Sequence, residues 1–207
     1  GVEKDFKEAE KWFRKAAEQG HESGQSGLGA MYATGQGVEK DYAKAIEWYR
    51  KAAEQKNASG QALLGEMYAN GLGVEKDFTE AVKWFRKSAE QGDTNGQAFL
   101  GGMYATGQGV EKDLAEAVKW YRKSAEQNHA DAQYSLGSMY YKGKGVEKDD
   151  KEAAKWFRKA AEQGDAKTQF NLGGMYFRGE GVEKDDKEAV KWYRKAAEQN
   201  VALAQFN

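Results

Sequence analysis

The residues best suited to binding chemistry are two aromatic–cation pairs, Tyr141-Lys142 and Phe177-Arg178, which stand 36 residues apart. An aromatic ring can cover an apolar side chain, and Lys or Arg can form charge-assisted hydrogen bonds with a carboxylate. The pairs therefore predict non-covalent binding of a segment that carries an acidic group beside an apolar one.

The sequence shows no comparable pattern for catalysis or for a cofactor. The chain has no cysteine, so it has no disulfide, no thiol nucleophile and no zinc finger. His21 and His129 share one repeat position, and neither has a second histidine one helical turn away, so no metal site is predicted. The Gly35-Gln36-Gly37 type of loop lacks the strand and the third glycine of a dinucleotide fingerprint. We expect neither an enzyme nor a cofactor protein.

Composition excludes two further classes of partner. Basic and acidic residues number 32 and 33, and the calculated pI is 6.3. A general binder of nucleic acid or of anionic membranes normally carries a basic excess, so we expect no nucleic-acid partner. No apolar run approaches the roughly 20 residues of a membrane span, and no signal segment is recognisable.

The elements that must position these residues follow from a repeat. The pentapeptide Gly-Val-Glu-Lys-Asp occurs six times at intervals of 36 residues, beginning at Gly1, Gly37, Gly73, Gly109, Gly145 and Gly181. A fixed period of this length predicts one solenoid over residues 1–207, with units 1–36, 37–72, 73–108, 109–144 and 145–180 and a partial unit 181–207. Neither end carries a polar capping unit, so we interpret the chain as a piece of a longer array or as an engineered chain.

Each unit contains two helices. The aspartate of the pentapeptide is a favoured N-cap for the first helix, whose apolar stripe carries one tryptophan per copy. We interpret the six tryptophans as core residues rather than as a row that stacks on sugars or bases. In the second helix, Gly71 suits a left-handed C-cap, and mid-helix Gly65 predicts a close approach of the neighbouring helix.

The unit resembles the Sel1-like repeat, a relative of the tetratricopeptide repeat. The resemblance is carried by Leu-Gly-x-Met-Tyr at 64–68, Gly-Val-Glu-Lys-Asp at 73–77 and the Ala-x-x-Trp-Phe-Arg-Lys segment that begins at Ala81. It implies antiparallel helix pairs in an all-α, right-handed superhelix. It also implies an adaptor or scaffold role, and for many members a bacterial periplasmic or secreted location.

In tetratricopeptide-like pairs the helix that carries Leu-Gly-x-Met-Tyr lines the concave groove, and its variable positions share one face. Copies one to three place mostly small residues there, whereas copies four and five place aromatic and charged ones. The candidate groove residues are Asp131, Tyr134, Tyr141, Lys142, Lys167, Phe170, Phe177 and Arg178. Tyr134 and Phe170 also fit the family's ordinary packing pattern, so the two aromatic–cation pairs are the stronger candidates.

Three functions remain open at this point. The first is a non-catalytic scaffold that binds a protein or peptide in the groove, as extended concave surfaces of repeat arrays allow. The second is an envelope or exopolysaccharide assembly scaffold that contacts a glycan or cell-wall enzymes. The third is a consensus-like designed repeat scaffold with no ligand, which the strict period favours.

Overall fold

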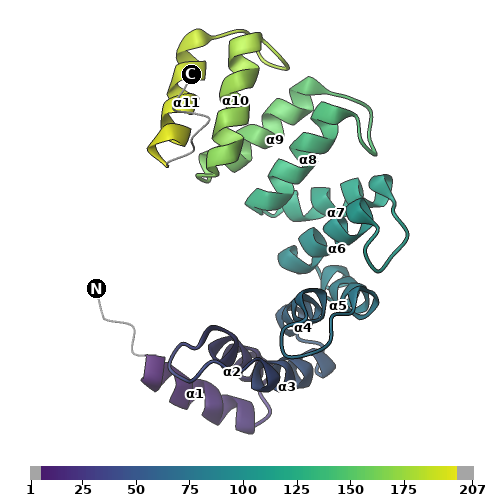
Figure 1. The fold of residues 1–207 in the computed structure, drawn as a ribbon, viewed down its shortest axis with the longest axis vertical. Helices are drawn as coiled ribbons and strands as arrows, with labels where there is room; N and C mark the ends of the chain where they lie inside the picture. The colour runs from purple at the N-terminus through teal and green to yellow at the C-terminus, as the bar shows by residue number, and fades with distance from the viewer. Residues whose placement is uncertain (1–5, 200–207) are drawn as a thin grey trace. The chain divides into compact units, whose positions relative to one another are not determined.

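Helices form all the regular secondary structure in the computed structural model, which describes residues 6–199 (Figure 1). Within that range there are eleven helices, each of 13 residues, and no strand. They are α1 (Phe6–Glu18), α2 (Glu22–Thr34), α3 (Tyr42–Glu54), α4 (Ala58–Asn70), α5 (Phe78–Glu90), α6 (Thr94–Thr106), α7 (Leu114–Glu126), α8 (Ala130–Lys142), α9 (Asp150–Glu162), α10 (Ala166–Arg178) and α11 (Asp186–Glu198). The predicted all-α class and the helix-pair repeat are confirmed.

The chain divides into two compact units, Gly1–Lys112 and Asp113–Asn207. Unit 1 holds α1 to α6, and unit 2 holds α7 to α11. In each unit the odd-numbered helices carry the tryptophans, and the even-numbered helices from α2 to α10 carry Leu-Gly-x-Met-Tyr. The expected groove residues therefore all lie in unit 2, on α8 and α10.

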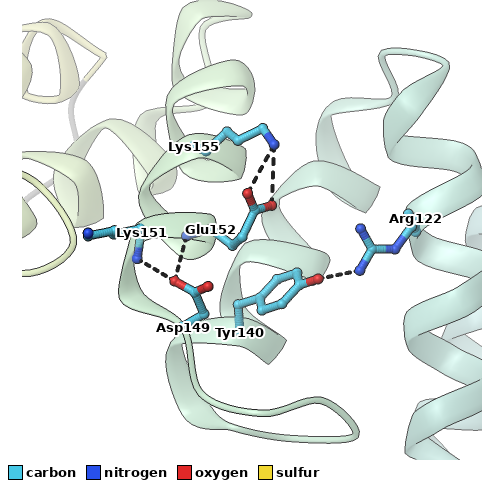
Figure 2. A network of polar contacts seen from close by, with 6 residues as sticks. All are labelled: Arg122, Tyr140, Asp149, Lys151, Glu152 and Lys155. Atoms are coloured by element: carbon cyan, nitrogen blue, oxygen red, sulfur yellow. Dashed lines mark hydrogen bonds and ion pairs between the residues drawn. The ribbon is translucent and has the colours of Figure 1, made fainter.

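The helix starts follow the predicted capping chemistry. The Asp41 and Asp77 carboxylates accept hydrogen bonds from backbone N–H groups three residues later, at 3.0 and 2.9 Å. The Asp149 carboxylate accepts from the backbone N–H groups of Lys151 and Glu152 (Figure 2). These bonds satisfy donors that have no partner inside the helix, so the aspartate of the pentapeptide fixes where the tryptophan helices α3, α5, α7, α9 and α11 begin.

Glycines act at the two places where the sequence predicted them. Gly71 caps α4 in the left-handed region with φ +69°, and Gly179 caps α10 with φ +71°. A Cβ on Gly65 would lie 2.7 Å from the Phe85 ring, so only glycine lets the α5 aromatic seat against α4. The mid-helix glycine thus admits a neighbouring ring, and its conformational cost in a helix is offset by that packing.

The prediction that the tryptophans are core residues is correct for the later copies and wrong for Trp12 in the first copy. Trp156 and Trp192 are 4% and 5% exposed, and Trp48, Trp84 and Trp120 are partly buried. Trp12 is 55% exposed, because α1 is the first described helix and no described helix precedes it. The leucines of the Leu-Gly step, in contrast, are fully buried in every complete copy: Leu28, Leu64, Leu100, Leu136 and Leu172.

A lysine covers the tryptophan in each described copy. Three residues after Trp84, the Lys87 ammonium lies 4.0 Å from the indole centroid, and Lys159 lies 4.4 Å from that of Trp156. A cation over an indole face is attractive, and the aliphatic stem of the lysine shields the ring from water. The recurrent Trp-x-x-Lys spacing therefore belongs to packing and not to a ligand site.

Buried glutamines join neighbouring repeats. In unit 2 the Gln133 side chain, 1% exposed, donates to the Ala125 carbonyl at 3.1 Å and accepts from the Gln163 amide at 2.7 Å. The same arrangement joins Gln61 to Gln91 in unit 1. The buried Gln133 side chain thus links α7, α8 and the C-terminal end of α9. This role accounts for the invariance of both glutamines among the copies.

Replacing Gln133 with leucine should lower the free energy of unfolding by about 1–2 kcal/mol, since the change deletes the three hydrogen bonds of its side chain. The Ala125 carbonyl keeps a backbone donor from Asn128, which limits the loss. The exposed partner supplies the control: Gln163→Leu should cost less, because its surroundings are open to water. Urea unfolding followed by circular dichroism measures both changes, and equal losses would contradict the assigned role of the buried glutamine.

A second recurrent link joins the two helices of a pair. The Arg50 guanidinium donates to the Tyr68 hydroxyl at 2.9 Å, and Arg86 donates to Tyr104 at 2.8 Å. Figure 2 shows the same contact between Arg122 of α7 and Tyr140 of α8. The recurrent arginine and tyrosine are therefore structural partners, which separates them from the variable Tyr141 and Arg178.

Candidate functional site

The structure brings most of the predicted groove residues together around one cavity of about 520 Å³ in unit 2. We call it the aromatic groove. Its lining comprises Tyr134, Ser138, Tyr141, Lys142, Phe157, Lys167, Phe170, Asn171, Gly174, Met175, Phe177, Arg178 and Tyr193. Seven of the eight predicted residues are among these, and Asp131, exposed in the first turn of α8, is the one that is not.

Two aromatic residues of the groove, Tyr134 and Phe170, pack against aromatic side chains of the neighbouring helices. The Tyr134 ring lies against Phe157 with centroids 5.8 Å apart, and Phe170 lies against Tyr193 at 5.2 Å. In unit 1 Phe99 makes a similar contact with Phe85. Tyr134 and Phe170 therefore make packing contacts between helices, in line with the family pattern, while one edge of each still lines the cavity.

Phe177 and Tyr141 differ in how much surface they offer. Phe177 is 55% exposed, and the Lys184 ammonium lies 5.5 Å from its ring centroid. Tyr141 is half-buried, and its ring has Lys148 at 5.7 Å. An exposed Phe ring on a groove wall supplies apolar area that a ligand can cover.

The Glu180 carboxylate contacts Arg178 and Tyr141, two residues that line the groove. The Arg178 guanidinium forms an ion pair with Glu180, Nη2 to Oε2 at 2.9 Å. The Tyr141 hydroxyl donates to that same oxygen at 3.0 Å. The hydrogen bonds from Arg178 and Tyr141 hold the pKa of the Glu180 carboxyl below its usual range. Arg178, which the sequence predicts as a cation for ligand binding, is thus paired within the chain.

The two lysines that line the groove, Lys142 and Lys167, form no ion pair within residues 6–199. The Lys167 ammonium lies 4.8 Å from the Tyr134 ring centroid, and a hydrogen bond with the Tyr134 hydroxyl raises the pKa of Lys167. Lys142 is exposed and has no ion-pair partner within residues 6–199. With Arg178 they give the lining of the groove three cations, and none of its lining residues is acidic, so its potential favours an anionic ligand.

Several residues of this site were not predicted, among them Glu180, Lys148, Phe157 and Tyr193. The signal for Glu180 was present, because the equivalent positions hold Gln36, Leu72, Gln108 and Lys144, so an acid occurs there only in copy five. Phe157 and Tyr193 belong to recurrent core positions, and nothing in their spacing marks the two copies that border an open cavity.

A second cavity, of about 570 Å³, lies in unit 1 on α1 and the start of α2. Its apolar walls include Trp12, Phe13 and Ala16. In later copies the residue equivalent to Phe13 is covered by a glycine-bearing helix, as Tyr49 is by Gly29. This cavity therefore lies on the face that a glycine-bearing helix covers in later copies, and its remaining lining includes His21, Glu22 and Ser23.

Residues 6–199 contain neither a candidate metal centre nor a candidate membrane span. No three histidine, aspartate or glutamate side chains of that range gather closely enough to hold a metal ion. No helix there is both long and apolar enough to cross a bilayer. His129 serves as the N-cap of α8, where its Nδ1 accepts from the Ala132 backbone N–H at 3.3 Å.

The chain belongs to the Sel1 repeat family. Six Sel1 repeats match the chain, at residues 1–21, 23–57, 58–93, 94–129, 130–165 and 166–201. Each full match pairs a Leu-Gly-x-Met-Tyr helix with the tryptophan helix that follows it. Proteins of this family are typically protein-interaction scaffolds and are generally non-catalytic. No curated protein sequence matches the chain.

Solved structures of bacterial proteins share the fold. A protective antigen present in uropathogenic Escherichia coli strains, which displays the SLR fold, is 44% identical with a TM-score of 0.90. The likeness covers 98% of this chain and 44% of the antigen, so this chain spans less than half of that protein. A Sel1 repeat protein from Oxalobacter formigenes is 40% identical with a TM-score of 0.88, covering 96% of this chain and 81% of that one. An immunity protein from Pseudomonas aeruginosa is 25% identical with a TM-score of 0.62, covering 93% and 74%.

Proposed function

We propose that this chain is a non-catalytic scaffold that binds a protein or peptide segment in the aromatic groove. The observation that carries the proposal is the change in the groove positions between copies. Where copy three has Ala105 and Thr106, copies four and five have Tyr141-Lys142 and Phe177-Arg178, and these four line one cavity. Aromatic and arginine side chains dominate binding hot spots, whereas small polar residues contribute little.

The chemistry of the lining defines the kind of segment that fits. Phe177, Tyr134 and Phe170 present ring edges and faces, and Lys142, Lys167 and Arg178 present positive charge. An extended segment with an acidic side chain beside an aromatic or aliphatic one satisfies both. Neither the family match nor the neighbours' descriptions point to a glycan, so a glycan ligand has no support beyond the aromatic side chains.

Arrays of peptides and of glycans, probed with the same labelled protein, test this function. We expect bound peptides to be enriched in Asp or Glu next to Phe, Leu or Tyr, and the glycan array to stay empty. Binding to glycans without any enrichment among the peptides would contradict the proposal and favour the assembly-scaffold alternative.

A further inference from the structure

The carboxylate of Glu180 stands where a ligand carboxylate would bind. Its Oε2 atom accepts from the Arg178 guanidinium at 2.9 Å and from the Tyr141 hydroxyl at 3.0 Å. These donors come from α10 and α8, which supply most of the residues that line the aromatic groove. A guanidinium and a hydroxyl converging on one oxygen is an arrangement that recognises carboxylates in general.

We propose that Glu180 fills the carboxylate subsite of the aromatic groove in the free protein, and that an acidic ligand binds by replacing Glu180 at Arg178 and Tyr141. The inference rests on the proposed function, because it concerns the same groove. It makes Glu180 the residue that sets how strongly the scaffold discriminates acidic segments from neutral ones.

The backbone around Glu180 allows its side chain to leave without a change in the fold. Gly179 ends α10 in the left-handed region, and the Glu180 backbone N–H donates to the Met175 carbonyl at 3.0 Å. This pairing is the usual closure of a helix C-terminus, so the main chain is held independently of the carboxylate. The Glu180 side chain is 32% exposed, and rotation about its own bonds takes it into solvent.

Once Glu180 leaves, the cations remain in the groove. The Arg178 guanidinium folds back over Gly174, so that a Cβ built on Gly174 would lie 3.0 Å from Nη1. Lys142 and Lys167 line the same cavity. Together with Arg178, these two lysines leave the vacated subsite cationic, so it attracts an anionic ligand group.

Because the pair is partly exposed, the competition it imposes is modest. Exposed ion pairs correspond to a factor of up to about five in an equilibrium constant, and the Tyr141 hydrogen bond adds to it. Removing the carboxylate should therefore strengthen binding of an acidic ligand about three- to tenfold. A neutral ligand does not compete with Glu180 for Arg178, so its affinity should not rise.

The test uses two probe peptides, Gly-Asp-Phe-Asp-Phe-Gly and its counterpart with Asn in place of each Asp, titrated by calorimetry. The variant is Glu180→Gln. The matched control is Glu183→Gln, which removes the same charge from the same connection, where Glu183 is exposed and contacts neither Arg178 nor Tyr141. We expect Glu180→Gln to bind the Asp peptide about three- to tenfold more tightly, and Glu183→Gln to change its affinity less than about twofold.

A second background separates the local contact from general electrostatics. With Arg178→Gln already present, Glu180→Gln should bring no gain, because the subsite no longer exists. An equal gain from Glu180→Gln and Glu183→Gln, or a persistent gain without Arg178, would overturn the inference while leaving groove binding intact. Failure of both peptides to bind any of these proteins would contradict both the inference and the proposed function.

Discussion

Replacing Trp156 with alanine is expected to lower the free energy of unfolding by about 3 kcal/mol, while Trp12→Ala should cost less than about 1 kcal/mol. The two residues occupy the same repeat position, but Trp156 is 4% exposed and Trp12 is 55% exposed. The estimate for Trp156 is at the low end for a buried indole, since its Nε1 has no hydrogen-bond partner within residues 6–199 and its removal relieves that cost.

Urea unfolding followed by circular dichroism measures both variants without depending on the tryptophan fluorescence that the changes remove. The partly buried Trp84 and Trp120 should give intermediate losses. If Trp12→Ala and Trp156→Ala destabilise the chain equally, then burial against the preceding helix does not determine the contribution of this position. The same result would undermine our account of how neighbouring repeats stabilise each other.

The second large effect concerns ligand binding. The double change of Phe177 and Arg178 to alanine should weaken binding of the acidic peptide by about 2 kcal/mol or more, roughly 30-fold. The melting temperature should stay nearly unchanged, because Phe177 is 55% exposed and the Arg178 side chain is 49% exposed. The variant removes apolar cover and a guanidinium from the groove without touching the core.

Copy three offers the matched control. It already has Ala105 where copy five has Phe177, so the equivalent change there is Thr106→Ala alone. Thr106 is exposed and its hydroxyl bonds only to carbonyls of its own helix, so binding should stay the same. Weaker binding in the control would place the ligand on unit 1 and contradict the assigned groove.

The sequence predicted the fold well because the features that define it are local. An aspartate that caps a helix, or a glycine in the left-handed region after one, acts within a few residues of its own position. The close approach at Gly65 was also predictable, since a recurrent mid-helix glycine is costly unless something fills the space. Trp12 is exposed although it shares the repeat position of the buried Trp156, because α1 is the first described helix, and the repeat pattern alone does not distinguish the two copies.

The polar contacts between helices were harder to predict. Gln133 and Gln163 each occupy an invariant repeat position, but they lie 30 residues apart on different helical segments, and this spacing gives no periodicity that a single helix would reveal. Glu180 was missed for a related reason. It lies in a connection, where the direction of a side chain depends on the cap geometry at Gly179, so composition showed its charge and not its partner.

The central claim is that ligand binding belongs to the aromatic groove of unit 2, and mapping the contact surface of a bound peptide tests it most directly. Backbone amide chemical shifts would be recorded with and without a peptide selected from the array. We predict that the largest changes fall on Ser138, Tyr141, Lys142, Gly174, Phe177 and Arg178. Changes confined to the exposed Lys- and Glu-rich faces of α9 and α11, with these six amides unaffected, would contradict the claim.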